Sequence, residues 1–212
     1  QAFDEWKKDL PQYSEEPFCR EIRMERKEAS DVLWNGGELK RTFSEEMQNM
    51  YAYCYYLDLP VLSLDQTSTY DAIDKFQLFI NKFPNSKKVE ESNKYIDELR
   101  LKLEVKSFDN AKLYFRTENY KAAVVAFSNL LKDFPYTIYK EEALFLSLKS
   151  SYLYAINSVE SKRQERLKLS LEEYYKLVDN FSQSKYLREA ERTFDAIQKE
   201  LGESALKSSG IN

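Results

Sequence analysis

The chain has 212 residues, of which 42% are hydrophobic and 32% are charged, and its formal net charge is −4. It contains only four Gly and five Pro, a composition that favours helices joined by short turns and disfavours a many-stranded sheet. The 32 Lys and Arg are interspersed among 36 Asp and Glu, so no basic stripe that could neutralise nucleic-acid phosphates is visible. The sequence therefore predicts an all-α protein that binds no nucleic acid. No apolar run approaches the roughly 20 residues that a membrane-spanning helix needs.

The N-terminal segment, residues 1–50, is the least regular part of the chain. Pro11, Pro17 and the pair Gly36-Gly37 break it into short pieces, which predicts one helix from about Pro17 to Trp34 and another from about Glu38 onward. The glycine pair follows no strand pattern and lacks the Lys-Ser/Thr ending of a phosphate loop, so a plain turn is expected there. Helices in this segment cannot be assigned to a repeat.

Small and aromatic residues alternate from Glu45 to Asp58, where Ala52 and Tyr55 lie three positions apart. The tyrosines could form a stacking surface for bases or sugars or could pack between helices, and the pattern favours packing. Cys54 in the same helix is expected to be a small buried residue. An extended connector follows, which Pro60 keeps out of helical conformation. Asp65 or Thr69 is the expected N-cap of the next helix.

Residues 70–84 and 120–135 carry one motif at an offset of 51. In both, a small residue, aromatic or aliphatic residues and a helix stop recur at fixed spacings. The matched pairs are Ala72 and Ala123, Ile73 and Val124, Phe76 and Phe127, Phe79 and Leu130, Phe83 and Phe134, and Pro84 and Pro135. Together with Ala111 and Tyr114 upstream, these are the spacings of a tetratricopeptide (TPR) helix pair. We expect Ala111 to face Ala123, with Tyr114, Phe127 and Leu130 filling the rest of the groove.

One unusually long helix, at about residues 86–116, is predicted between the two motifs. That stretch contains no Pro or Gly. It has an apolar stripe at helical spacing formed by Val89, Ile96, Leu99, Leu103 and Ala111. Residues 51–201 are therefore expected to form a TPR-like helix-pair solenoid in which this helix links two repeats.

The C-terminal part continues the pattern less regularly. Ile138 to Asn157 is predicted to be the first helix of the next pair, and a charged turn at Glu160 to Arg166 is expected to lead into a helix from Leu167 to Phe181. In that helix Ser170 takes the position of Ala123, and Ser182 takes that of Pro135. The last helix is predicted from Lys185 to Leu201, ending at Gly202 as a terminal cap, with residues 202–212 as a polar tail.

No reactive constellation is visible. The chain contains no His, which removes the commonest general base and the commonest zinc ligand. Pairs such as Glu141-Glu142 and Glu172-Glu173 fall on predicted helix surfaces, where carboxylates are expected to be solvated. We therefore predict no catalytic residue, no metal site and no cofactor. On the same reasoning Glu141→Ala should be nearly silent, whereas Ala123→Leu should overpack a helix pair at a cost of about 1–3 kcal/mol.

Three stretches resemble the BamD (YfiO) family of outer-membrane β-barrel assembly lipoproteins in the form found in Bacteroidetes-type bacteria. They are YAYCYY at 51–56, SLDQTSTYDAIDKFQLFINKFPNS at 63–86 and AKLYFRTENYKAAVVAFSNLLKDFPYTIYKEEAL at 111–144. With the long helix between them, the resemblance covers residues 51 to about 201. Residues 1–50 depart from the family, which has two helix pairs before YAYCYY and an acylated cysteine further upstream.

The resemblance implies a non-enzymatic scaffold on the periplasmic face of the outer membrane, held by a lipid anchor that is not visible in this chain. Such a protein would bind the periplasmic POTRA domains of BamA and other assembly subunits, and would help deliver unfolded outer-membrane proteins. In the family, N-terminal repeats are associated with substrate targeting sequences and C-terminal repeats with BamA. By region, this implies Tyr53, Tyr56, Asp65 and Gln66 for the first role and Tyr186, Arg188 and Arg192 for the second. The alternative function is that of another periplasmic TPR adaptor, one that coordinates cell-envelope or division complexes.

Overall fold

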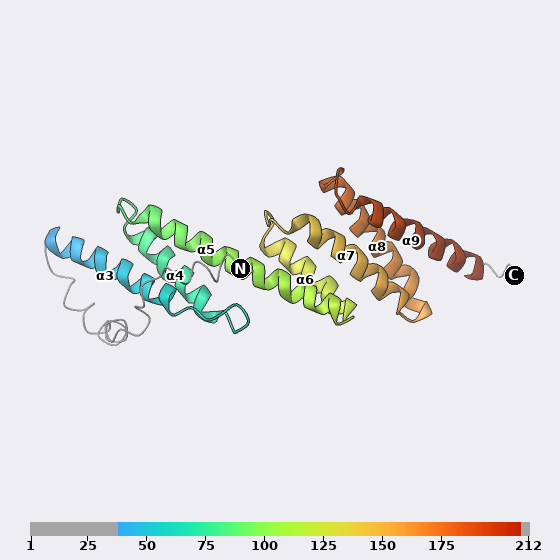
Figure 1. Ribbon diagram of the computed structural model, residues 1–212, viewed down its shortest axis with the longest axis horizontal. Coiled ribbons are helices and arrows are strands. Elements are labelled where there is room, and N and C mark those ends of the chain that lie inside the picture. Colours follow the sequence, from blue (N-terminus) through green and yellow to red (C-terminus); the bar gives the residue numbers. More distant parts are fainter. Residues whose placement is uncertain (1–37, 209–212) are drawn as a thin grey trace. The chain divides into compact units, whose positions relative to one another are not determined.

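The computed structural model describes residues 38–208, with side chains over residues 44–202. Within this range the regular structure is entirely helical, which confirms the all-α prediction (Figure 1). The helices are α3 (Glu38–Leu57), α4 (Thr67–Lys82), α5 (Val89–Arg116), α6 (Tyr120–Asp133), α7 (Lys140–Ile156), α8 (Glu160–Asn180) and α9 (Leu187–Ser208). The predicted helix from Pro17 to Trp34 and the Gly36-Gly37 turn lie outside the described residues.

The chain divides into two compact units, unit 1 up to Leu103 and unit 2 from Glu104 onward. Helix α5 contributes residues to both. It is one continuous helix of 28 residues, which at the usual rise per residue is about 42 Å long. The predicted long helix is thereby confirmed, although it begins at Val89, three residues later than expected.

Unit 1 is a three-helix core built from α3, α4 and the first part of α5. Ala52 and Ala72 are completely buried, which lets α3 and α4 approach closely, and Phe76 fills the space beside them. Ile96 and Leu99 close this core from α5. Cys54 of α3 is also buried, as expected.

Unit 2 continues the helix pairs in chain order. Its helices pack as α6 with α7, α7 with α8, and α8 with α9, an arrangement typical of a TPR-like array. Ala111, Ala123, Phe127 and Leu130 are buried in one cluster, so the core predicted for the second motif is confirmed. In α8 the buried Ser170 takes the position of Ala123, and its hydroxyl donates to the Oγ of the buried Ser151 of α7 at 2.9 Å. The substitution of Ser170 for Ala123 therefore keeps a small side chain where two helices meet.

Tyr114 was expected in this core, and that prediction is wrong because its side chain is 42% exposed. The buried stripe of α5 runs through Phe108, Ala111 and the partly buried Phe115. At 100° per residue, Tyr114 lies on the flank of that stripe, so three-residue spacing from Ala111 leads away from the core.

The turn between α5 and α6 satisfies the ends of both helices. Glu118 has a left-handed φ of 59°. Its N–H donates to the Phe115 carbonyl at 3.1 Å, and the Asn119 N–H donates to the Tyr114 carbonyl at 2.9 Å, which is the Schellman arrangement. Asn119 Oδ1 in turn accepts from the Ala122 N–H at 3.4 Å. A helix C-cap therefore adjoins a helix N-cap directly.

Three inter-repeat turns, at residues 83–88, 134–139 and 181–186, share one hydrogen-bond pattern. In each, the N–H of a Phe C-cap closes its helix and the Phe carbonyl accepts from a Ser or Thr three residues later. The hydroxyl of that Ser or Thr accepts from the N–H two residues further on, at 3.0–3.1 Å. Pro84 and Pro135 occupy the second position of two of these turns and Ser182 occupies it in the third. Pro therefore favours the turn without being required for it.

Two predicted boundaries near the C-terminus are wrong. Residues 160–166 are not a charged turn, since α8 begins at Glu160. Two of their cations make contacts with α7, since the Arg163 guanidinium donates to the Ile156 carbonyl at 3.0 Å and Arg166 lies 4.1 Å from the centroid of the Tyr154 ring, although Arg163 Nε is buried without a hydrogen-bond partner among the described residues. Gly202 does not end α9, which continues to Ser208. Helical hydrogen bonding thus outweighs the modest helix penalty of one exposed glycine.

Candidate functional site

Tyr53 and Tyr56, two residues of the first predicted partner-binding set, belong to an aromatic cluster between α3 and α5. The rings of Tyr56 and Tyr95 lie 4.6 Å apart, and those of Tyr53 and Tyr95 lie 5.5 Å apart. Tyr56 is buried and its hydroxyl donates to Glu98 Oε2 at 2.6 Å. Burial, reinforced by the Glu98 carboxylate, raises the pKa of Tyr56 far above its usual range. Tyr56 therefore packs the core, as the pattern of small and aromatic residues suggested, and half-buried Tyr53 covers it.

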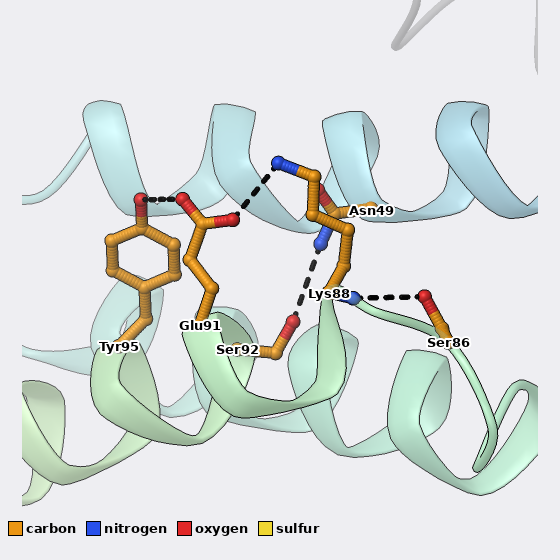
Figure 2. Close-up of polar contacts among 6 residues, drawn as sticks. All are labelled: Asn49, Ser86, Lys88, Glu91, Ser92 and Tyr95. Carbon is orange, nitrogen blue, oxygen red and sulfur yellow. Dashed lines mark hydrogen bonds and ion pairs between the residues drawn. The ribbon is translucent and has the colours of Figure 1, made fainter.

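Around this cluster the start of α5 makes polar contacts, one of which crosses to α3. Figure 2 shows the Glu91 carboxylate between the Tyr95 hydroxyl, at 3.1 Å, and the Lys88 ammonium, at 2.9 Å. The hydrogen bond from Lys88 lowers the pKa of Glu91. From α3, the Asn49 amide donates to Ser92 Oγ at 3.2 Å. Polar contacts therefore surround the aromatic cluster where α5 begins.

Gln66, another residue of the first predicted set, lies in the loop before α4. Gln66 is 4% exposed, and its amide nitrogen donates to the carbonyls of Val61 and Leu64, each at 3.0 Å. Gln66 Oε1 accepts from the Thr69 hydroxyl at 2.8 Å. The Gln66 side chain thus holds the loop together from inside. Its backbone is the N-cap of α4, so the prediction of Asp65 or Thr69 as the cap is wrong.

Asp65 lies on the surface of the same loop. Its carboxylate accepts from the Thr67 hydroxyl at 2.6 Å and from the Thr67 N–H at 3.3 Å. A carboxylate at the start of a helix stabilises it through the unpaired N–H groups there. Asp65 thus assists the N-terminus of α4 while remaining exposed.

The second set of predicted residues lies at the start of α9. The Tyr186 ring stacks on Phe145 of α7, with centroids 4.5 Å apart and an interplanar angle of 8°. Arg188 and Arg192 are exposed. The structure therefore assigns Tyr186 to a contact within the chain and leaves the two arginines on the surface.

Residues that the sequence reasoning missed form a repeated junction between helix pairs. On α5, Glu104 Oε1 accepts from the Thr137 hydroxyl at 2.5 Å and from the Ile138 N–H at 3.2 Å. One turn further along α5, Phe108 stacks on Tyr139 with centroids 4.4 Å apart. We call this arrangement of carboxylate, hydroxyl and stacked rings the repeat junction.

The same junction recurs between α7 and the turn before α9. Glu141 Oε1 accepts from the Ser184 hydroxyl at 2.7 Å and from the Lys185 N–H at 3.2 Å. The stacked rings are those of Phe145 and Tyr186. The prediction that Glu141 is a solvated surface residue is therefore wrong.

An ion pair completes each repeat junction. Lys112 binds Glu142 at 2.8 Å while lying over the Phe108 ring, and Lys149 binds Glu189 at 2.7 Å while lying over the Phe145 ring. The sequence signal is a Glu-x3-Phe-x3-Lys series on one helix, followed by Ser/Thr-x-Tyr-x-x-Glu at the next turn. It occurs at 104–112 with 137–142 and again at 141–149 with 184–189. Comparison of the two series could have identified it.

Alignment of the two repeat junctions shows which residues of α7 correspond to Arg188 and Arg192 of α9. The turns of the two junctions lie 47 residues apart, and Ala143 and Ala190, which are also 47 apart, are both fully buried. By this register Arg188 corresponds to Glu141, and Arg192 corresponds to Phe145. Helix α9 thus carries two cations at the positions that correspond to Glu141 and Phe145, the α7 residues that contact the turn at residues 181–186.

No group of three or more Cys, Asp or Glu side chains in the described part of the chain is arranged to hold a metal ion. Over the same residues, no helix is both long and apolar enough to cross a bilayer. What the described surface offers is a series of helix faces and rigid turns.

Helix pairs joined by one recurrent turn, and fastened by carboxylates and stacked rings, define a TPR-like helical scaffold. The sequence model of YfiO, described as an outer membrane lipoprotein, matches residues 41–167, more than half of the chain. The chain therefore belongs to the YfiO family. It is also 27% identical over 111 residues to the outer membrane protein assembly factor BamD of Rickettsia prowazekii (strain Madrid E), a match that covers 52% of this chain and 44% of that protein. The chain thus matches less than half the length of this relative.

Proposed function

We propose that this chain is a non-enzymatic scaffold subunit of the machinery that assembles β-barrel proteins in the outer membrane. The observation that carries the proposal is the YfiO family match over residues 41–167, which spans α3 to the start of α8. The relative in Rickettsia prowazekii, named an assembly factor, supports the same role. In this proposal the protein lies on the periplasmic face of the outer membrane, held by a lipid anchor.

Each proposed partner is assigned to a different region of the described chain. The periplasmic POTRA domains of BamA would bind at the C-terminal end of the described chain, where Arg188 and Arg192 form an exposed cationic pair on α9. Segments of unfolded outer-membrane proteins would bind near the loop before α4, where Asp65 is exposed and Tyr53 is half-buried. Tyr56 and Gln66 would contribute by holding that region in shape, because their polar atoms are bonded within unit 1.

Co-purification tests the proposal. A tagged chain produced at its native level should recover BamA from detergent-solubilised outer membranes. The double variant Arg188→Glu/Arg192→Glu should recover less BamA, whereas Lys121→Glu/Lys168→Glu, which reverses two exposed cations on α6 and α8, should not. Recovery of division or peptidoglycan-synthesis proteins without BamA would contradict the proposal and favour the adaptor alternative.

A further inference from the structure

Three turns of identical backbone hydrogen bonding differ at the two positions that point outward. In the first and third turns these positions are polar, and in the second turn, between α6 and α7, they are large and apolar. The first position is held by Asn85, Tyr136 and Gln183, and the second by Lys87, Ile138 and Lys185.

The exposure of the two apolar side chains is extensive. Tyr136 is 97% exposed and Ile138 is 76% exposed. Because the other two turns form with Asn, Gln and Lys at these positions, the fold does not require a large apolar residue at either. Keeping both in water instead of burying them is unfavourable, which points to a contact outside the described chain.

The turn that carries them is held rigidly. Glu104 accepts from both the Thr137 hydroxyl and the Ile138 N–H, so the backbone between the two apolar residues is fixed to α5. Tyr139, directly after Ile138, is fixed by its stack on Phe108. A projection fixed in advance loses little conformational entropy when it binds, which is the usual property of an interface anchor.

We propose that Tyr136 and Ile138 form a docking projection that inserts into an apolar pocket on a folded protein partner. Tyrosine is enriched among the residues that dominate interface energies, since it combines a large apolar ring with a hydroxyl that can bond at the pocket rim. The identity of the complex that supplies this partner rests on the proposed function, but the chemistry of the projection does not.

The other possible occupants fit less well. Two side chains expose far less than the roughly 1,000 Å² that a specific interface buries, so this turn alone would not hold a second copy of the chain. The flanking charges alternate as Lys132, Asp133, Lys140 and Glu141. Such a balanced set provides no net attraction to an anionic lipid surface. In the proposed scaffold role the chain holds a folded partner at other surfaces too, so such a partner needs only a pocket for these two side chains.

Site-specific photocrosslinking in intact cells tests the inference. A photoreactive phenylalanine analogue replaces Tyr136 in one strain and Gln183, the equivalent residue of the third turn, in another. The analogue at position 136 should form an adduct with one protein of the cell envelope, identified by mass spectrometry, and the analogue at 183 should not.

The adduct is then checked with purified components. Binding of the identified protein to Tyr136→Asn/Ile138→Lys, which installs the residues of the first turn, should be weaker by about tenfold or more than binding to the parent chain. The matched control Gln183→Asn should bind like the parent, and both variants should keep the parental unfolding midpoint.

Each other outcome overturns the inference. In the crosslinking experiment, these outcomes are the lack of an adduct at position 136, or an adduct with lipid, with residues 1–37 of the same chain or with a second copy. In the binding experiment, the outcome is an unchanged affinity of the double variant. An adduct with a protein outside the assembly machinery, together with weakened binding of the double variant, would sustain the projection and contradict the proposed function. The two claims therefore fail separately.

Discussion

Replacing Glu141 by Ala removes the acceptor of one repeat junction without touching the hydrophobic core. The lost contacts are the hydrogen bond from the Ser184 hydroxyl at 2.7 Å and that from the Lys185 N–H at 3.2 Å. The stacked rings of Phe145 and Tyr186 remain. The variant therefore isolates the polar half of the junction.

The expected magnitude follows from the exposure of these groups. A hydrogen bond to a charged partner contributes about 1.5–3 kcal/mol when water is excluded. Glu141 and Ser184 are only half-buried and Lys185 is exposed, so water replaces part of what is lost. We expect Glu141→Ala to lower the free energy of unfolding by about 1–2 kcal/mol. Glu141→Gln, which keeps one acceptor oxygen, should fall between parent and Ala.

Urea unfolding followed by circular dichroism measures this free energy, and Glu172→Ala is the matched control. Glu172 is an exposed carboxylate on α8, so its removal changes the net charge equally and should alter stability by no more than about 0.5 kcal/mol. Amide hydrogen exchange at Lys185 should accelerate in Glu141→Ala and stay parental in the control. Equal unfolding free energies for Glu141→Ala and Glu172→Ala would refute the junction.

Four further variants test other parts of the fold. Ala123→Leu, at a fully buried position, should cost about 1–3 kcal/mol in urea unfolding, and a neutral result would contradict the close approach of α5 and α6. Gly202→Ala should stabilise α9 by up to about 1 kcal/mol, since nothing lies within 4 Å of the added Cβ; a loss in thermal stability would mean that α9 ends there. Ser182→Pro should gain about 0.4–1 kcal/mol in unfolding free energy because two sister turns hold Pro at that position, whereas Gln183→Pro should be destabilising. Tyr56→Phe tests alkaline stability: the raised pKa of Tyr56 means that its contribution is complete below the ordinary tyrosine pKa near 10 and is lost as pH rises further, so the variant should lose stability less steeply there, by up to about 1.4 kcal/mol per pH unit. Parallel pH profiles of Tyr56→Phe and the parent would contradict the buried hydroxyl.

Much of the architecture was predictable because it depends on residue size. Ala72, Phe76, Ala123 and Phe127 recur at one offset and are all completely buried, as a close helix pair requires. The length of α5 followed from the absence of Pro and Gly. These features are local or periodic, so a single sequence records them directly.

The polar contacts were less predictable because they join residues far apart in the chain. Glu141 looks like any solvated carboxylate on a helix, and only the fold brings Ser184, 43 residues later, within hydrogen-bond distance. Gln66 was likewise assigned to partner binding by region alone, although its amide nitrogen donates to a carbonyl inside its own loop. Tyr114 was misplaced for a simpler reason, since one helical spacing does not tell which flank of the buried stripe a residue occupies.

The central claim is that the chain is a scaffold of outer-membrane β-barrel assembly, and its most direct test is depletion of the protein from its own cells. The account predicts that folded β-barrel proteins in the outer membrane then decline, as measured by quantitative mass spectrometry of outer-membrane fractions, while soluble periplasmic proteins keep their levels. Unchanged β-barrel protein levels after full depletion would contradict it.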